Sequence, residues 1–248
     1  MSLRVFAARP PASAPAILDP DETHYLRRVR RVGDGASVDV IDDHGGLWRA
    51  TVLGGDARRT ELRLDATIPA PAPARELVLL LGLPEPAAVL DLLPGLVELG
   101  VAAIAWVRCA RTQSGPPGPA RVERVLRAAQ RQCGRPTPPT LLGSFAVGEA
   151  ADLRRELPGF FAWEQRRGER DDLALAGGAR LLVGPEGGLT ADEAGALLAA
   201  DFGPIALGPY TLRSGTAALV GLARLMFAAS PCPASPGLAP TPRPASPA

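Results

Sequence analysis

The stretch Leu181–Thr190, which reads LLVGPEGGLT, is the part of this chain that decides its fold. Three apolar residues at its start are typical of a strand end, and the glycines that follow predict a tight corner where backbone amides can approach a ligand. Thr190 and Glu193 have the spacing of a capping box, so a helix is predicted to begin there. A lone corner of this kind is also compatible with an ordinary turn between a strand and a helix.

A second strand–glycine–helix corner follows in the stretch Ile205–Thr216, which reads IALGPYTLRSGT. Two such corners close together in the chain suggest one ligand site built from two loops. Neither has the lysine of a nucleotide-binding P-loop or the GxGxxG spacing of a dinucleotide site. No histidine lies near Ser214, so hydrolysis by a Ser/His/Asp triad is not indicated.

From Arg75 onward, apolar runs alternate with helical patterns, which predicts an α/β domain with a mainly parallel sheet. Strands are predicted at 77–83, 102–107, 160–163 and 181–183, and helices at 86–99, 120–132, 190–200 and 216–228. Both corners then lie at the carboxyl ends of strands, where such folds bind ligands. Glu164 directly follows a predicted strand and is interpreted as a surface carboxylate. Pro94 and Gly95 inside a helix cost about 3 and about 1 kcal/mol, so we expect a kink or an early break.

Residues 1–70 are predicted to form a small β-rich domain. Its strands are expected at 3–6, 36–41, 47–53 and 60–67. A helix is predicted to begin with Asp19 as its cap and Glu22 closing a capping box, and to stop near Gly33. The alternating proline and alanine of 68–74 predict a stiff linker before a second domain at 75–229. A tail rich in proline, alanine and serine, 230–248, is expected to be disordered.

The composition restricts the class of protein. The chain has 248 residues, of which 46% are hydrophobic, so a sizeable core is available. No apolar run reaches the roughly 20 residues of a membrane-spanning helix, and the N-terminus lacks the pattern of a signal peptide. Three scattered cysteines and two histidines provide neither a disulfide framework nor a zinc pair. We therefore expect a cytoplasmic protein with no membrane and no metal. Cys133 is either a nucleophile or, more simply, an inert helical cysteine.

Arginine is clustered although the net charge is only +1. The segment 108–135 holds seven arginines against the single acid Glu123, and a second cluster lies at 27–31. The complete lack of lysine reflects a genomic bias, but the clustering favours a surface that contacts RNA phosphates. His24, Arg27 and Arg30 share one predicted helix face. That face either contacts RNA or is a solvated basic surface.

Taken together, residues from about 3 to 228 resemble the RsmE family, whose members use S-adenosylmethionine to methylate N3 of a uridine in 16S small-subunit ribosomal RNA. The segments that carry the resemblance are 24–30 with Gly33 and Asp42, then 98–101 and 132–135, and above all the two glycine corners. The resemblance implies a SPOUT-type trefoil-knotted α/β domain after a PUA-like RNA-binding domain. It also implies a homodimer formed through the knot, with 16S rRNA or the small ribosomal subunit as partner.

The resemblance also implies roles for particular residues. Arg213 is expected to stabilise charge on the uracil carbonyl oxygens, and Glu186 to make a polar contact near the cofactor or base. The expected cofactor-binding residues are Leu182, Val183, Gly184, Pro185, Gly187, Gly188, Leu207, Gly208, Leu212 and Thr216. The expected RNA-binding residues are His24, Arg27, Arg30, Arg111, Arg121 and Arg135.

The chain departs from the family pattern at several polar positions. Tyr210 replaces an arginine, Gly215 replaces a glutamate, and Gly95 stands at a lysine position. A glutamate before Gln132 is also missing. These losses leave an alternative open, namely a weakly active or non-catalytic relative that binds RNA. The target nucleotide, and whether naked RNA or an assembled subunit is the substrate, also stay open.

Overall fold

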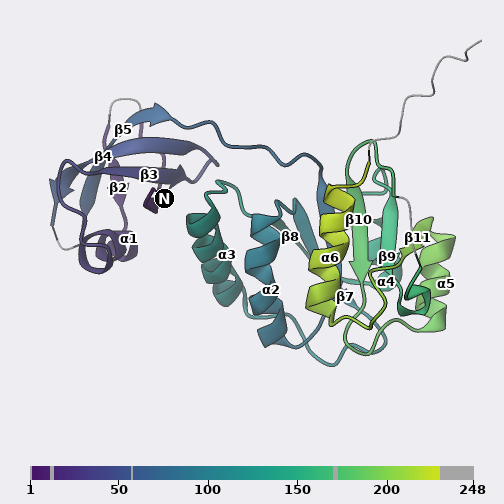
Figure 1. Ribbon diagram of the computed structural model, residues 1–248. Helices are drawn as coiled ribbons and strands as arrows, with labels where there is room; N and C mark the ends of the chain where they lie inside the picture. The colour runs from purple at the N-terminus through teal and green to yellow at the C-terminus, as the bar shows by residue number, and fades with distance from the viewer. Residues whose placement is uncertain (1, 12–13, 57, 170–172, 230–248) are drawn as a thin grey trace, which may run out of the picture.

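The computed structural model describes residues 2–11, 14–56, 58–169 and 173–229, and it contains two sheets joined by the coil 68–76 (Figure 1). The predicted tail 230–248 lies outside the described residues. The described helices include none that is long and apolar enough to cross a membrane.

The N-terminal sheet has the order β1-β3-β4-β5-β2. Its strands are β1 (Arg4–Ala7), β2 (Ala16–Leu18), β3 (Ser37–Asp42), β4 (Leu47–Gly55) and β5 (Thr60–Thr67). β1 pairs with β3 in parallel and the other pairs are antiparallel. Apolar side chains on one face, such as Val38, Val40 and Val52, form its core. Sequence reasoning missed β2, which is only three residues long.

The helix of this domain begins as predicted but ends early. α1 (Pro20–His24) is capped by Asp19, whose Oδ1 accepts from the N–H of Glu22 at 2.7 Å. The helix continues as the π-helical η1 (Tyr25–Val29) and ends before Gly33. The predicted capping box is wrong, because the carboxylate of Glu22 accepts from the backbone N–H of Phe6, at 3.1 Å, in place of the cap.

The second sheet is parallel throughout, in the order β11-β9-β10-β6-β7-β8. Its strands are β6 (Leu77–Gly82), β7 (Ala103–Arg108), β8 (Thr140–Ala146), β9 (Gly159–Ala162), β10 (Ala179–Val183) and β11 (Phe202–Ile205). The helices are α2 (Pro86–Glu98), α3 (Pro119–Cys133), α4 (Val147–Asp152), α5 (Ala191–Ala199) and α6 (Ser214–Met226), and η2 (Glu164–Arg166) is a 3-10 turn. The predicted α/β architecture is confirmed. β8 and α4 were not predicted, and the strand before the second corner, β11, was expected without a range.

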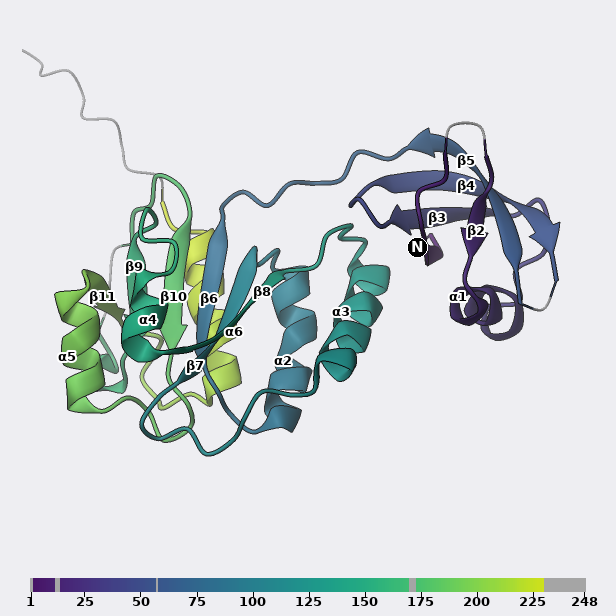
Figure 2. The same cartoon turned by 180° about the vertical axis from the view of Figure 1, so that it is seen from behind.

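Helices cover both faces of the parallel sheet (Figures 1 and 2). One core lies between the sheet and α2, α3 and α6, and a second lies between the sheet and α4 and α5. The predicted break at Pro94 does not occur, because α2 runs unbroken to Glu98. Leu93 and Leu96, on either side of the proline and glycine, are completely buried, and this tertiary packing outweighs the poor local propensity.

The N-terminal domain contacts the second domain through the end of α3. Arg4 Nη1 donates to the carbonyl oxygens of Arg131, at 3.1 Å, and Gln132, at 2.9 Å, which have no partner within the helix. Gly134 ends the helix with a φ of 85°, and a Cβ there would lie 2.7 Å from Arg4 Cζ. The glycine therefore serves both the helix end and the contact between domains.

Candidate active site

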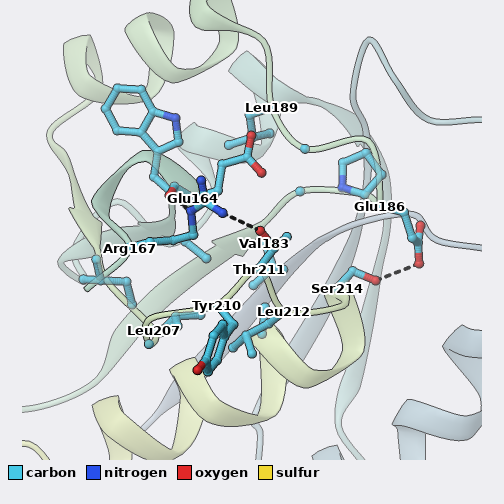
Figure 3. A pocket seen from close by; sticks show the side chains of 18 residues that line it. Glu164, Arg167, Val183, Glu186, Leu189, Leu207, Tyr210, Thr211, Leu212 and Ser214 are labelled. Atoms are coloured by element: carbon cyan, nitrogen blue, oxygen red, sulfur yellow. Dashed lines mark hydrogen bonds between the residues drawn. The ribbon is translucent and has the colours of Figure 1, made fainter. Parts of the chain in front are cut away.

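Both glycine corners line a single pocket at the carboxyl ends of the parallel strands (Figure 3). The pocket holds about 660 Å³ of empty space, counting the part open to solvent. Its lining residues are Ala162, Trp163, Glu164, Arg167, Val183, Gly184, Pro185, Glu186, Gly188, Leu189, Ile205, Leu207, Gly208, Tyr210, Thr211, Leu212, Ser214 and Ala217.

The first corner is tight because glycines permit its path. A Cβ on Gly184 would lie 3.1 Å from Leu189 Cγ, and Gly188 has a φ of 71°, which favours glycine. The predicted capping box is confirmed: Thr190 Oγ1 accepts from the N–H of Glu193 at 3.2 Å, and Glu193 Oε2 accepts from that of Thr190 at 2.8 Å. The corner is thereby fixed to the start of α5.

The second corner is joined to the first by one side-chain hydrogen bond. Ser214 Oγ, at the start of α6, donates to Glu186 Oε1 at 3.0 Å (Figure 3). Ser214 is buried and Glu186 is exposed at the rim. The two loops that sequence reasoning assigned to one site therefore meet directly.

The segment after β9 forms a third wall that sequence reasoning did not include. Arg167 Nη1 donates to Thr211 Oγ1 at 3.0 Å, and the N–H of Gly168 donates to the carbonyl oxygen of Gly208 at 3.1 Å. Glu164 was interpreted as a surface carboxylate, but it lines the pocket. Its position directly after a predicted strand was the signal that placed it near the carboxyl ends of the strands.

Seven of the ten residues expected to bind the cofactor line the pocket: Val183, Gly184, Pro185, Gly188, Leu207, Gly208 and Leu212. The other three have different surroundings. Leu182 packs in the core on the opposite face of β10, Gly187 lies outside the pocket beneath Arg111, and Thr216 is exposed on α6. Ser214 and Ala217 take the place of Thr216, because they lie on the pocket side of the helix.

Of the two residues expected to be catalytic, Glu186 lines the pocket and Arg213 does not. Arg213 is the exposed residue that precedes α6, and its side chain makes no hydrogen bond that caps the helix. The sequence places it correctly at the end of the corner, but the direction of its side chain depends on the turn.

The predicted RNA-binding residues fall into two groups. His24, Arg30, Arg111 and Arg121 are exposed. Arg27 instead donates to the carbonyl oxygen of Val32 at 3.0 Å and pairs with Asp34 at 2.6 Å. Arg135 donates to the carbonyl oxygen of Val101 at 2.8 Å, and burial lowers its pKa. Both of these arginines stabilise their own domains, a role that the sequence pattern did not reveal.

Comparison with known proteins agrees with this architecture. A family model for an RNA methyltransferase domain matches residues 70–226, and one for an RNA methyltransferase PUA domain matches residues 18–64. The chain is similar to proteins named ribosomal RNA small subunit methyltransferase E. It is 31% identical to that of Mycobacterium bovis over 86% of both chains, and 27% identical to that of Synechocystis over 82% of this chain and 70% of the relative.

A solved structure shares the fold. The methyltransferase of the same name from Neisseria gonorrhoeae, solved bound to S-adenosyl methionine, superposes with a TM-score of 0.80 and 24% identity, over 92% of this chain and 98% of that one. The α/β domain and the PUA domain before it therefore have their counterparts in one protein. By the match of the methyltransferase domain and the identity to its relatives, this chain belongs to the RsmE family of RNA methyltransferases.

Proposed function

We propose that this chain transfers a methyl group from S-adenosylmethionine to N3 of one uridine in 16S ribosomal RNA. The observation that carries the proposal is the single pocket closed by the two glycine corners. The names of the relatives from Mycobacterium bovis and Synechocystis support a small-subunit RNA as substrate. An enzyme with this substrate acts where ribosomes assemble, so we place it in the cytoplasm.

The pocket suits a nucleoside that carries a cation. Apolar side chains of Val183, Ile205, Leu207 and Leu212 can pack against an adenine, while carboxylates and hydroxyls occupy other parts of the wall. Gly208 has a φ of 147°, and a Cβ added to it would meet no described atom within 4 Å, so its backbone lies open to a ligand. When bound, the cofactor supplies a methyl group already activated on a sulfonium.

The protein's share of the chemistry is alignment and charge stabilisation. Uracil N3 must lose a proton, and negative charge then develops on the flanking carbonyl oxygens. Glu186 borders the pocket, and the hydrogen bond from Ser214 holds one of its oxygens, so we propose it as the carboxylate nearest the reacting nitrogen. Arg213 remains a proposed charge-stabilising residue that would need to turn toward bound RNA.

We further propose that the strands around β10 form a trefoil knot and that two copies pair through it. β10 lies between β9 and β6, so the chain returns to pair beside β6 after it has formed β7, β8 and β9. Tyr210 lies before α6 and Phe227 directly follows it. They are 80% and 82% exposed, which is unusual for large side chains of mainly apolar character. Sedimentation should show a dimer for the unaltered chain and a monomer for Phe227→Asp. A monomeric unaltered chain would contradict this part.

The test of the function is methyl transfer. Purified chain, labelled S-adenosylmethionine and small-subunit RNA or particles from cells lacking the enzyme should yield 3-methyluridine after digestion. Comparison of naked RNA with particles identifies the substrate. Absence of that nucleoside with cofactor binding intact would contradict the proposal.

One observation favours the second candidate, a weakly active or non-catalytic relative. Among the described residues that line the pocket the only cation is Arg167, and its guanidinium is bonded to Thr211. Calorimetric binding of S-adenosylmethionine compared with turnover separates the two. RNA binding without turnover would favour this candidate.

A further inference from the structure

A second, smaller pocket lies beside the first glycine corner. It has about 340 Å³ of empty space, counting the part open to solvent, and it shares Pro185 and Glu186 with the cofactor pocket. Its remaining lining residues come from the segment between β6 and α2, the loop after β7 and the corner itself: Leu83, Pro84, Glu85, Arg111, Gln113, Ser114 and Gly187. The two pockets therefore have a common wall.

The loop after β7 is fixed against this wall at two points. The backbone N–H of Ala110 donates to Glu193 Oε1 at 2.7 Å, and Arg111 Nη1 donates to the carbonyl oxygen of Gly187 at 2.6 Å. Glu193 Oε2 also accepts from the backbone N–H of Thr190, the N-cap residue of α5. The loop, the corner and the helix are thus held as one unit, and Arg111 has a defined position at the pocket.

Gly187 makes that position possible. A Cβ at residue 187 would lie 3.1 Å from Arg111 Cβ and 3.3 Å from its Cδ, so a side chain there would displace the arginine. The bond to the carbonyl oxygen uses one of the five N–H donors of the guanidinium. Because Arg111 is exposed, other donors remain available to a ligand.

We propose that the smaller pocket receives the uracil of the target uridine, with Arg111 as the fixed cation beside its carbonyl oxygens. The assignment rests on the proposed function and names the base site for it. A uracil within RNA offers two carbonyl acceptors and one N–H donor. The donors of Arg111, Gln113 and Ser114 match the acceptors, and the carboxylate of Glu186 matches the N–H.

The common wall accounts for the transfer itself. Glu186 borders both pockets, so a base in one and a methyl donor in the other meet beside its carboxylate. The N3 proton passes to this carboxylate as the N3–carbon bond forms and the methyl–sulfur bond breaks. Arg111 stabilises the negative charge that develops on the carbonyl oxygens.

The first test is Arg111→Ala, assayed with saturating cofactor and small-subunit RNA. We expect kcat to fall about 100- to 1000-fold, as for loss of one charge-stabilising donor. The pH profile of kcat should move to higher pH, because N3 ionises less readily without the cation, and Arg111→Lys should restore part of the activity. Calorimetry should show unchanged affinity for S-adenosylmethionine. The control is Arg155→Ala, an exposed arginine that precedes β9 and so lies at the amino ends of the strands, with unchanged kcat.

A second variant distinguishes loss of contact with the base from loss of the hydrogen bond by which Arg111 holds the first corner. Gln113 lines the base pocket, and no hydrogen bond joins its side chain to the corner within the described part of the chain. Gln113→Ala should therefore weaken binding of small-subunit RNA in the presence of S-adenosylhomocysteine and lower kcat. Normal kcat and pH profile in both variants would overturn the assignment. Loss of cofactor affinity in Arg111→Ala, with Gln113→Ala normal, would also overturn it. If the unaltered chain and the control form no 3-methyluridine, the proposed function itself fails.

Discussion

Glu22, buried in the N-terminal domain, forms an ion pair with the partly buried Arg131 on α3 of the methyltransferase domain. The other Glu22 oxygen accepts from the backbone N–H of Phe6, and Arg127 Nη2 lies 3.6 Å from Glu22 Oε1. The guanidinium of Arg131 also lies over the ring of Tyr25, 4.2 Å from its centroid. Two arginines of a cluster expected to face RNA therefore join the two domains.

Loss of this carboxylate should uncouple the domains. Glu22→Ala removes the carboxylate that pairs with Arg131 and accepts from Phe6, and it should lower the free energy of unfolding by about 1–3 kcal/mol, as for loss of a hydrogen-bonded charged group. Urea denaturation measures the loss, and small-angle scattering should show a larger radius of gyration. The matched control is Glu123→Ala, an exposed position on α3, with a change within about 0.5 kcal/mol. Equal stability of the two variants would contradict the role of the pair.

Asp42 makes stability depend on acid pH. Burial opposes its charge, but hydrogen bonds from the Gly46 N–H, Trp48 Nε1 and Arg9 outweigh this and lower the pKa of its carboxyl from 3.8. A lowered pKa stabilises the fold above the unfolded value, and the contribution disappears as the pH falls through the folded value. Asp42→Asn should therefore cost about 1–3 kcal/mol at pH 7 and progressively less below pH 3.8.

Urea midpoints between pH 7 and pH 3 provide the measurement. Asp21→Asn, at an exposed position on α1, is the control and should follow the unaltered chain throughout. A constant difference between Asp42→Asn and the unaltered chain at every pH would refute the titration of this group.

Local signals predicted the elements that end in corners and caps. Thr190 with Glu193 needs only four consecutive residues, so the start of α5 was predictable. β8 was not predicted, and β11 was expected without a range, because they are the two edges of the parallel sheet. β8 is mostly exposed and has Gly143 at a φ of 108°, and β11 contains Pro204, both tolerated at edges but unlike a buried strand.

The sequence predicted the backbone corners of the site but not the side chains that reach it from other segments. Gly184 and Gly208 were enough to predict the two corners from the sequence, because few other residues suit such turns. The side chains of Glu164 and Arg167 reach the pocket from a segment after β9, which only the sheet order brings beside β10. The arginines could not be sorted for the same reason, since Arg131 finds its partner in another domain and Arg135 finds a carbonyl oxygen in the turn after α2.

Gly208 should be required for cofactor binding. Its φ of 147° is unfavourable for other residues, although a Cβ would meet nothing within 4 Å. Gly208→Ala should therefore cost about 1–3 kcal/mol of strain in the binding-competent loop and weaken S-adenosylmethionine binding by the equivalent factor, roughly 5- to 150-fold. Calorimetry is the measurement. Gly195→Ala, in the exposed face of α5, should instead raise stability by about 1 kcal/mol with unchanged affinity. Identical affinity in both variants would contradict a role for the corner.

Gly95 shows why a missing lysine in this chain does not imply a missing charge in the pocket. A Cβ there would lie 2.8 Å from Leu219 Cδ2, because α2 packs on α6 at this point, and Gly95 does not line the pocket. Gly95→Lys should overpack this contact and destabilise the fold by about 1–3 kcal/mol. Cofactor affinity and kcat should not rise. Adding Leu219→Ala should recover part of the stability, whereas Ala87→Lys, at an exposed position of α2, should be neutral. A stable Gly95→Lys variant with higher kcat would show that residue 95 faces the reacting groups after all.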